Sequence, residues 1–243
     1  MGQPLADAIA IEAKRRDASN VFVVIANSLS RKTSILDGVK LVLGNKYAGC
    51  FDQTVTHVPR ESAIDLAAIL RSSNADLILT IGGGTCLDTV KMALVCLAEN
   101  ITKAEGLEAF AIRVNKEGER ETPFIKSPPI RQIAAPTTLS GAEFSDLSGC
   151  VDTKTQVKQL FSSSEIGPAA VILDPEITVH TPEDLWLSTG VRALDHAVET
   201  LSSSEAMPIA DAGALHAIRL LSESLPVNKA NPYDLDKRLD SQM

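Results

Sequence analysis

The chain has 243 residues, 44% of them hydrophobic and only 4% aromatic, which suits an aliphatic core in one large or two small domains. Its net charge of −8 argues against nucleic acid as a main partner, because phosphate backbones are bound by basic surfaces. The N-terminus lacks a signal-peptide pattern and no apolar run approaches the ~20 residues of a membrane span, so we expect a cytoplasmic protein without a membrane partner.

The first hundred residues alternate between predicted helices and buried strands. The apolar periodicity predicts helices over residues 4–16, 30–44, 59–75 and 86–100, and strands over residues 20–30, 52–58 and 76–84. Helices that alternate with strands are typical of a parallel sheet covered on both faces. The sequence therefore predicts an α/β fold for this part of the chain.

The remaining residues change character near residue 180. Before that point we expect a charged, proline-rich loop over 115–129, a strand that becomes a small-residue loop over 130–145, and a short buried strand within 154–176. From residue 181 onward we expect helices, including a strong helix over 208–225 that is followed by a polar tail. We therefore expect an α/β domain over residues 1–178 and the start of an all-helical domain, incomplete, over residues 179–243.

Three consecutive glycines stand between a predicted strand and a predicted helix in "ILTIGGGTCLDTVKMAL", residues 78–94. Glycines let a ligand approach the backbone, and the start of a helix attracts anions. The pattern is neither G-x-G-x-x-G nor a P-loop, and by itself it leaves open a tight turn without a ligand. Asp88 follows on the first turns of the helix, where it could bond a ribose or merely favour the positive end of the helix.

Two further segments carry polar side chains in suggestive places. "APTTLSGAEFSD" follows a predicted strand, and in open α/β sheets ligands bind at the carboxyl ends of strands. In "STGVRALDHAVE", helical spacing puts Arg192, Asp195, His196 and Glu199 on one face. This face could line a catalytic site, although the spacing alone favours a solvated helix surface with ion pairs.

Taken together, the three segments resemble the iron-containing alcohol dehydrogenase superfamily. "GGGTCLDTVK" resembles its GGGS-x-x-D-x-x-K signature, "PTTLSGAEFS" its second nucleotide loop, and "DPEITVHTPEDLWLSTGVRALDHAVE" the start of its helical domain. Within the superfamily, the residues of the last two segments are most similar to those of the maleylacetate reductase branch. The resemblance, which runs through most of residues 20–225, implies a dehydroquinate synthase-like fold that binds NAD(P)H between an α/β domain and a helical domain.

The resemblance also implies a set of cofactor-binding residues. Gly83, Gly84, Thr85 and Asp88 would hold the pyrophosphate and neighbouring groups, Thr137, Thr138 and Leu139 would line the path from adenosine to nicotinamide, and Lys158 and Asn27 would lie near the ribose groups. Many relatives carry an Asp where this chain has Asn27. Because an uncharged Asn repels a 2′-phosphate less, we expect NADPH to be tolerated as well as NADH.

One departure from the family bears on the chemistry. In metal-dependent members, the residue four positions before the first metal-binding His is an Asp ligand, but here Arg192 stands four positions before His196. An Arg cannot coordinate a divalent cation, and the later His216 lies on an apolar helix, so the sequence predicts no bound metal. Arg192 would instead hold a carboxylate or developing enolate, with His196 as proton donor or orienting group and Asp195 positioning one of them.

The leading interpretation is therefore an NAD(P)H-dependent oxidoreductase that reduces a small anionic carbonyl substrate, such as an unsaturated oxo-acid. The chain also lacks the family's first strands and most of its helical domain, so we expect a product shortened at both ends. One alternative is a catalytically impaired nucleotide-binding remnant that acts as a subunit of another protein. Another is a metal-dependent alcohol or glycerol dehydrogenase, or a related lyase, which requires an intact metal-ligand set. The sequence leaves open whether the chain forms a homodimer.

Overall fold

The computed structural model describes residues 1–204 and 207–243, and the contacts among them divide the chain into two compact units. The sheet unit comprises Ala6–Pro136 and Ala142–Ile172, and the helical unit comprises Met1–Leu5, Thr137–Gly141 and Leu173–Met243. None of the helices in these described ranges is long and apolar enough to cross a membrane. A parallel sheet with helices, followed by a helical part, confirms the predicted fold class.

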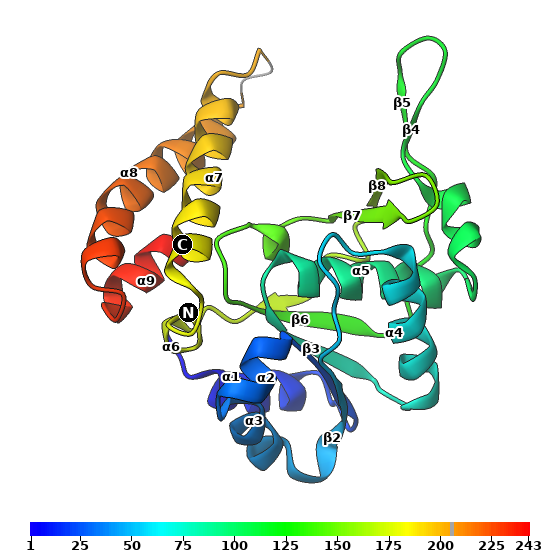
Figure 1. The fold of residues 1–243 in the computed structure, drawn as a ribbon, viewed down its shortest axis with the longest axis horizontal. Coiled ribbons are helices and arrows are strands. Elements are labelled where there is room, and N and C mark those ends of the chain that lie inside the picture. The colour runs from blue at the N-terminus through cyan, green and yellow to red at the C-terminus, as the bar shows by residue number, and fades with distance from the viewer. Residues whose placement is uncertain (205–206) are drawn as a thin grey trace. The chain divides into compact units, whose positions relative to one another are not determined.

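The sheet unit is built around five strands in the spatial order β2-β1-β3-β6-β9, and every neighbouring pair is parallel. The strands are β1 Val21–Ile25, β2 Tyr47–Phe51, β3 Leu77–Gly82, β6 Arg131–Pro136 and β9 Ala170–Val171. The helices of this part are α1 Leu5–Arg15, α2 Asn27–Lys32, α3 Ile35–Leu43, α4 Arg60–Ser72 and α5 Gly84–Ala98. Figure 1 shows α4 and α5 on one face of the sheet and α1 and α3 on the other. This two-sided cover explains why the central strands β1 and β3 are buried throughout.

Short elements complete the sheet unit. They are the 3₁₀ turns η1 Gly44–Lys46, η2 Ala104–Phe110 and η3 Ala142–Phe144, the small hairpin of β4 Arg113–Val114 with β5 Arg120–Glu121, and the longer hairpin of β7 Leu147–Asp152 with β8 Val157–Ser162. The β7–β8 hairpin was not predicted. Only Phe161 of β8 is buried, so this strand lacks the buried apolar run that marks the central strands.

Two predicted elements of the first hundred residues are wrong in detail. The second strand is Tyr47–Phe51, and the predicted strand over 52–58 is an irregular connection instead. His57 and Val58 have φ values of +68° and +53°, a left-handed conformation that ends any extended run. The predicted helix over 30–44 is divided into α2 and α3, because Thr33 is extended and its hydroxyl donates to the Leu29 carbonyl oxygen at 2.7 Å.

The helical unit contains α6 Pro175–Thr178, α7 Glu183–Leu201, α8 Pro208–Ala230 and α9 Leu235–Gln242. The predicted polar tail after residue 225 is wrong: α8 continues through Pro226 to Ala230, and Asp234 then caps α9 by accepting a bond from the Lys237 amide at 3.0 Å. Polar residues dominate α9, which is why the apolar pattern did not reveal it.

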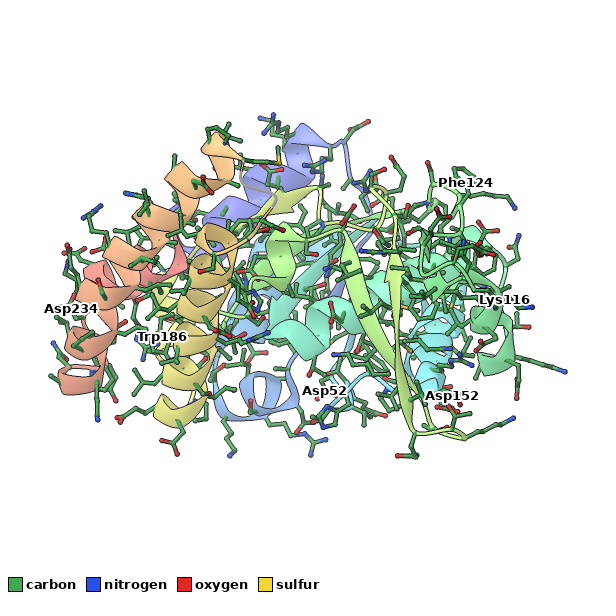
Figure 2. All side chains as sticks on the ribbon, turned by 90° about the horizontal axis from the view of Figure 1, so that it is seen from above. Asp52, Lys116, Phe124, Asp152, Trp186 and Asp234 are labelled. Carbon is green, nitrogen blue, oxygen red and sulfur yellow. The ribbon has the colours of Figure 1, made fainter. Side chains whose placement is uncertain are left out.

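Trp186 lies at the centre of the helical unit and can be followed in Figure 2. Its side chain is only 1% exposed, and its indole Nε1 donates to Asn228 Oδ1 at 3.1 Å. Trp186 packs in one apolar cluster with Leu139, Leu221 and Leu225. The short segment 137–141 therefore contributes to the core of the helices rather than to the core of the sheet.

Candidate functional site

The order of the strands places a topological switch point between the inner strands β1 and β3. From β1 the chain moves outward to β2 and then returns to the other side of β1 as β3, so the direction of winding reverses between β1 and β3. In doubly wound sheets, ligands bind at such a switch point, outside the carboxyl ends of the strands. Here those ends are joined by a bond from the Ala26 amide to the Ile81 carbonyl oxygen at 2.9 Å.

The glycine turn lies at this switch point. Gly82 ends β3, and a Cβ added to it would lie 2.6 Å from Cys86 Sγ and 3.4 Å from the Ala26 Cβ, so no larger residue fits. The helix α5 begins at Gly84, and its cap residue Gly83 offers no side chain to bond the first amides. The first N–H groups of a helix have no partner within the helix and carry its positive pole. Free amide groups at a helix start can bind an anion, so the turn has the geometry that an anion site needs. Binding of a pyrophosphate by Gly83, Gly84 and Thr85 stays a prediction.

Asp88 lies one turn further along α5, beside a fully buried lysine. The Lys91 ammonium is 0% exposed and donates to the carbonyl oxygens of Ala142 at 2.7 Å and Leu147 at 2.9 Å. It lies 3.6 Å from Asp88 Oδ1, which is too far for a hydrogen bond, and this buried carboxylate oxygen has no other hydrogen-bond partner among the described residues. A carboxylate oxygen that accepts no hydrogen bond has the capacity for a further donor.

Burial also shifts the pKa values of Asp88, Lys91 and the nearby Glu143. It raises the pKa of the Asp88 carboxyl above its usual value, although Lys91, the Gly149 amide and Lys158 oppose the rise. The same burial lowers the pKa of the Lys91 ammonium. Glu143, which is 6% exposed, has its pKa raised to about 7, again mainly by burial, and its Oε2 has no partner within the described chain. We call Asp88, Lys91 and Glu143 the buried ionic cluster.

Two of the predicted cofactor residues lie close to this region of the sheet unit. Lys158, an exposed residue of β8, lies with its aliphatic chain against Gly149, close enough for its charge to act on Asp88. Asn27 is the first residue of α2, directly after the carboxyl end of β1, and it is exposed. Asn27, Asp88 and Lys158 therefore belong to the same unit as the glycine turn.

Thr137, Thr138 and Leu139 belong to the helical unit. All three are buried: the Thr137 carbonyl oxygen accepts a bond from Thr181 Oγ1 at 2.6 Å, and the Leu139 amide donates to Thr189 Oγ1 at 3.1 Å. The Leu139 side chain packs in the Trp186 cluster. Its predicted contact with the cofactor path stays a prediction, because its contacts here are structural.

The three predicted catalytic residues lie on an exposed part of α7. The Arg192 Nη1 donates to Asp195 Oδ2, and these side chains are 60% and 47% exposed. His196 is exposed, and its carbonyl oxygen accepts a bond from Thr200 Oγ1 at 2.8 Å. Arg192 and Asp195 are thus brought together, while the catalytic roles of all three residues remain predictions.

A divalent metal does not fit the donors that these residues provide. Within the part of the chain that the structure describes, no three His, Cys, Asp or Glu side chains gather in a group that could hold a metal ion. On α7 the position that would supply a carboxylate ligand carries the cationic Arg192, which repels a cation. We therefore derive no chemical step through a metal.

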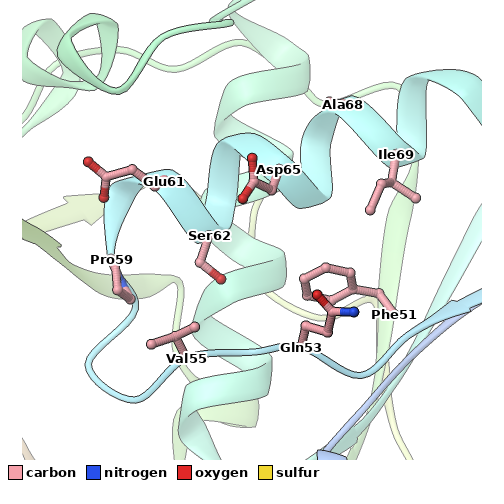
Figure 3. Close-up of a pocket in the computed structure, with 9 residues that line it drawn as sticks. All are labelled: Phe51, Gln53, Val55, Pro59, Glu61, Ser62, Asp65, Ala68 and Ile69. Carbon is pink, nitrogen blue, oxygen red and sulfur yellow. The ribbon is translucent and has the colours of Figure 1, made fainter.

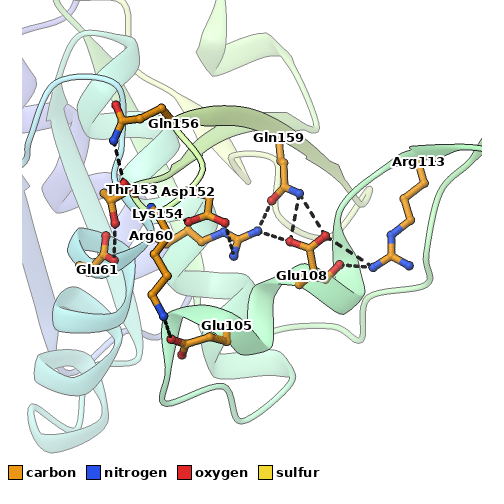
Figure 4. Close-up of polar contacts among 10 residues, drawn as sticks. All are labelled: Arg60, Glu61, Glu105, Glu108, Arg113, Asp152, Thr153, Lys154, Gln156 and Gln159. Carbon is orange, nitrogen blue, oxygen red and sulfur yellow. Dashed lines mark hydrogen bonds and ion pairs between the residues drawn. The ribbon is translucent and has the colours of Figure 1, made fainter.

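A polar network around Arg60 lies elsewhere in the sheet unit and joins several of its elements (Figure 4). Arg60 is 4% exposed, lies 2.5 Å from Glu108 Oε2 and 3.4 Å from Asp152 Oδ2, and also bonds Gln159. It joins α4 to η2 and to the β7–β8 hairpin. Sequence reasoning missed this residue, and it also left Lys91 and Glu143 out of the site. For Lys91, the spacing to Asp88 in "CLDTVK" was an available signal.

Comparison with known proteins agrees with this geometry. The profile of the iron-containing alcohol dehydrogenase family matches residues 1–175, and the profile of the C-terminal part of the same family matches residues 186–243. The chain belongs to the iron-containing alcohol dehydrogenase family. The predicted resemblance is thereby confirmed.

Individual relatives in this family include dehydrogenases and a maleylacetate reductase. The chain is 36% identical over 203 residues to the dehydrogenase FUM7 of Gibberella moniliformis, covering 82% of this chain and 47% of that protein. It is 32% identical over 171 residues to the NAD-dependent methanol dehydrogenase of Bacillus methanolicus, covering 70% of this chain and 42% of that protein. The crystal structure of maleylacetate reductase from Agrobacterium tumefaciens superposes with a TM-score of 0.75 at 25% identity, over 98% of this chain and 57% of that one. This chain therefore spans about half the length of the curated relatives it matches.

Proposed function

We propose that this chain binds a nicotinamide dinucleotide at the switch point of its sheet and serves an oxidoreductase that reduces a small carbonyl or unsaturated oxo-acid. The observation that carries the proposal is the uncapped start of α5, which faces the switch point with a glycine turn that excludes side chains. Asp88 Oδ1 beside it accepts no hydrogen bond among the described residues, although Lys91 lies 3.6 Å away, and it suits a ribose hydroxyl as donor. The names of the dehydrogenase and reductase relatives support the same class of reaction.

Each residue has a separate task in this proposal. The amides of Gly83, Gly84 and Thr85 hold the pyrophosphate, Asp88 accepts from a ribose hydroxyl, and Lys158 donates to a ribose oxygen. The cofactor, when bound, supplies the hydride that the side chains cannot supply. On α7, Arg192 holds a substrate carboxylate in a bidentate grip, Asp195 orients the guanidinium, and His196 donates a proton to the reduced product.

Titration of the protein with NADH and with NADPH, followed by nicotinamide fluorescence, tests cofactor binding. We expect both to bind, with affinities within about tenfold of each other, because Asn27 carries no charge that would repel a 2′-phosphate. Asp88→Asn should weaken binding, whereas Asp37→Asn, an exposed carboxylate on α3, should not. No saturable binding of either cofactor would contradict the proposal.

A panel of oxo-acids and neutral carbonyl compounds tests the reaction. Arg192→Ala is expected to lower kcat/KM for anionic substrates by at least about tenfold, with the dissociation constant of NADH unchanged. Equal losses for neutral and anionic substrates would reject the carboxylate role of Arg192. Cofactor binding without turnover of any compound would favour a nucleotide-binding subunit instead of a complete enzyme.

Metal content is an independent test of the same proposal. Protein purified without added metal should contain neither iron nor zinc in stoichiometric amounts, since Arg192 replaces a carboxylate ligand. Treatment with a chelator should leave NADH affinity unchanged. One equivalent of tightly held iron or zinc would overturn the proposed role of Arg192.

A further inference from the structure

A pocket of about 680 Å³ opens in the sheet unit between α4 and the connection that follows β2 (Figure 3). It is lined by Phe51, Gln53, Val55, Pro59, Glu61, Ser62, Asp65, Ala68 and Ile69. None of these residues belongs to the proposed cofactor site. The volume lies within the range of about 300–1,000 Å³ that is typical of small-molecule sites.

The walls of the pocket combine apolar surface with a few polar groups. Val55 is 50% exposed and Ile69 is 39% exposed, while Phe51 is buried at 9%. Figure 3 shows Val55 on the connection side of the pocket and Ile69 on the helix side. Such a surface can remove the apolar body of a ligand from water, which is the main favourable term in small-molecule binding.

Ser62 provides the observation that points to a ligand. It is 5% exposed, and its hydroxyl oxygen is buried without a hydrogen-bond partner among the described residues. Figure 3 shows this hydroxyl directed from α4 toward the Gln53–Val55 segment across the pocket. A buried hydroxyl without a partner is unfavourable, so a ligand that bonds it gains a contact that the protein leaves open.

The charge of the pocket selects the kind of ligand. Glu61 and Asp65 are separated by one turn on the same face of α4, and Lys, Arg and His are absent from the lining that the structure describes. Glu61 Oε1 accepts a bond from Thr153 Oγ1 at 2.8 Å, but the Asp65 carboxylate has no partner within the described residues. The pocket therefore attracts a cation and repels an anion.

We propose that this pocket binds a small organic cation, namely a primary ammonium group carried on a compact apolar body. The ammonium donates to the Ser62 hydroxyl oxygen and to the Asp65 carboxylate, with Glu61 adding charge at the rim. The apolar body packs against Phe51, Val55 and Ile69. This site is separate from the nicotinamide site and does not depend on the function proposed above.

Isothermal titration calorimetry with phenethylamine at pH 7 tests the proposal, with 2-phenylethanol and 3-phenylpropanoate as the neutral and anionic matches. We expect saturable binding of phenethylamine, and binding at least about tenfold weaker for the two matches, because only the ammonium satisfies the carboxylates. Equal affinity for the alcohol, or no binding of the amine, would overturn the proposal.

Two variants locate the binding site, and a third serves as the control. Asp65→Asn should weaken phenethylamine binding by about tenfold and Ser62→Ala by several-fold, whereas Asp37→Asn should leave the affinity within about twofold. Asp65 is exposed, so its variant remains folded even if Ser62→Ala lowers the stability of α4. Unchanged affinity in Asp65→Asn would place the binding elsewhere and reject this site.

Saturating NADH separates this proposal from the function proposed above. Because the two sites share no residue, the affinity for phenethylamine should stay within about twofold in the presence of NADH. Competition between the two ligands would show that the amine occupies the cofactor site and would overturn the proposal. The amine titration remains valid if NADH itself fails to bind.

Discussion

Lys91 and Lys40 form the same lysine–aspartate pair in two different surroundings. Both lie three residues after an Asp on a helix, at 3.6 Å from Asp88 and 3.8 Å from Asp37, but Lys91 is 0% exposed and Lys40 is 42% exposed. Lys91→Met would leave two carbonyl oxygens and the Asp88 carboxylate buried without their cation. We expect the free energy of unfolding, measured with urea at pH 7, to fall by about 3 kcal/mol or more.

Lys40→Met is the matched control and should change the free energy of unfolding by less than about 0.5 kcal/mol. Similar effects of the two substitutions would mean that burial does not determine how much the Lys91–Asp88 pair contributes to the free energy of unfolding. Stability within error of the unaltered protein for Lys91→Met would contradict the structure of the buried ionic cluster.

Glu143 makes stability depend on pH. Its pKa in the folded protein is raised from 4.5 to about 7, so folding takes up a proton between these values and stability falls as the pH rises from about 5 to 8. Glu143→Gln cannot lose a proton. The free energy of unfolding of the variant, minus that of the unaltered protein, should therefore be higher at pH 8 than at pH 5 by roughly 2–3 kcal/mol. Urea denaturation at the two pH values measures this difference, and Glu117→Gln, an exposed carboxylate, should show none.

At the scale of residues, the sequence predicts candidate site residues where they are adjacent in the chain. Gly82 to Gly84 and Asp88 are such a case, because a strand, a turn and a helix start follow one another directly. The environment of Lys91 could not be predicted in this way. Its partners are backbone carbonyl oxygens at Ala142 and Leu147, which any residue type supplies and which only the fold brings near.

Among the elements, α9 is attached to the helical unit through Arg238. Its side chain is 1% exposed, donates to the carbonyl oxygens of Pro232 at 2.5 Å and Thr178 at 2.7 Å, and lies 4.5 Å from the centre of the Trp186 ring. Arg238→Lys keeps the charge but loses the planar fork and the stacking. We expect a loss of about 2 kcal/mol in the stability of the helical unit.

Trp186 fluorescence measures this effect, because Trp186 is the only tryptophan in the chain and lies in the helical unit. Arg219→Lys on α8 is the control: that guanidinium is 54% exposed and pairs with Glu223, so its replacement should shift the transition little. If the unfolding transition shifted equally in the two variants, the buried contacts of Arg238 would not be what holds α9.

Element predictions succeeded where burial governed the pattern and failed elsewhere. The strands β1 and β3 and the helices α4 and α5 were predicted because each buries an apolar face. The strand predicted over 52–58 has alternating residues, but His57 and Val58 adopt left-handed conformations that alternation does not reveal. The helix α9 was missed because capping and a buried arginine hold it, rather than an apolar stripe.

For the molecule as a whole, cofactor binding should leave a local footprint in hydrogen exchange. NADH at about 100 times its dissociation constant stabilises the bound form by about 2.7 kcal/mol. We expect slower exchange in peptides that contain residues 26–30 and 82–88, at the switch point, and no change in the β4–β5 hairpin. Protection restricted to other segments of the sheet unit would reject the switch point as the cofactor site.

The division of the chain into units has a consequence for anyone who wishes to cut the protein into parts. The backbone passes between the two units four times, after residues 5, 136, 141 and 172. A fragment that starts at residue 179 would leave behind Leu139, a member of the Trp186 cluster, and the first five residues. No single cleavage of the chain therefore yields two intact pieces, and inserting a foreign domain at the 172–173 junction should disturb both units.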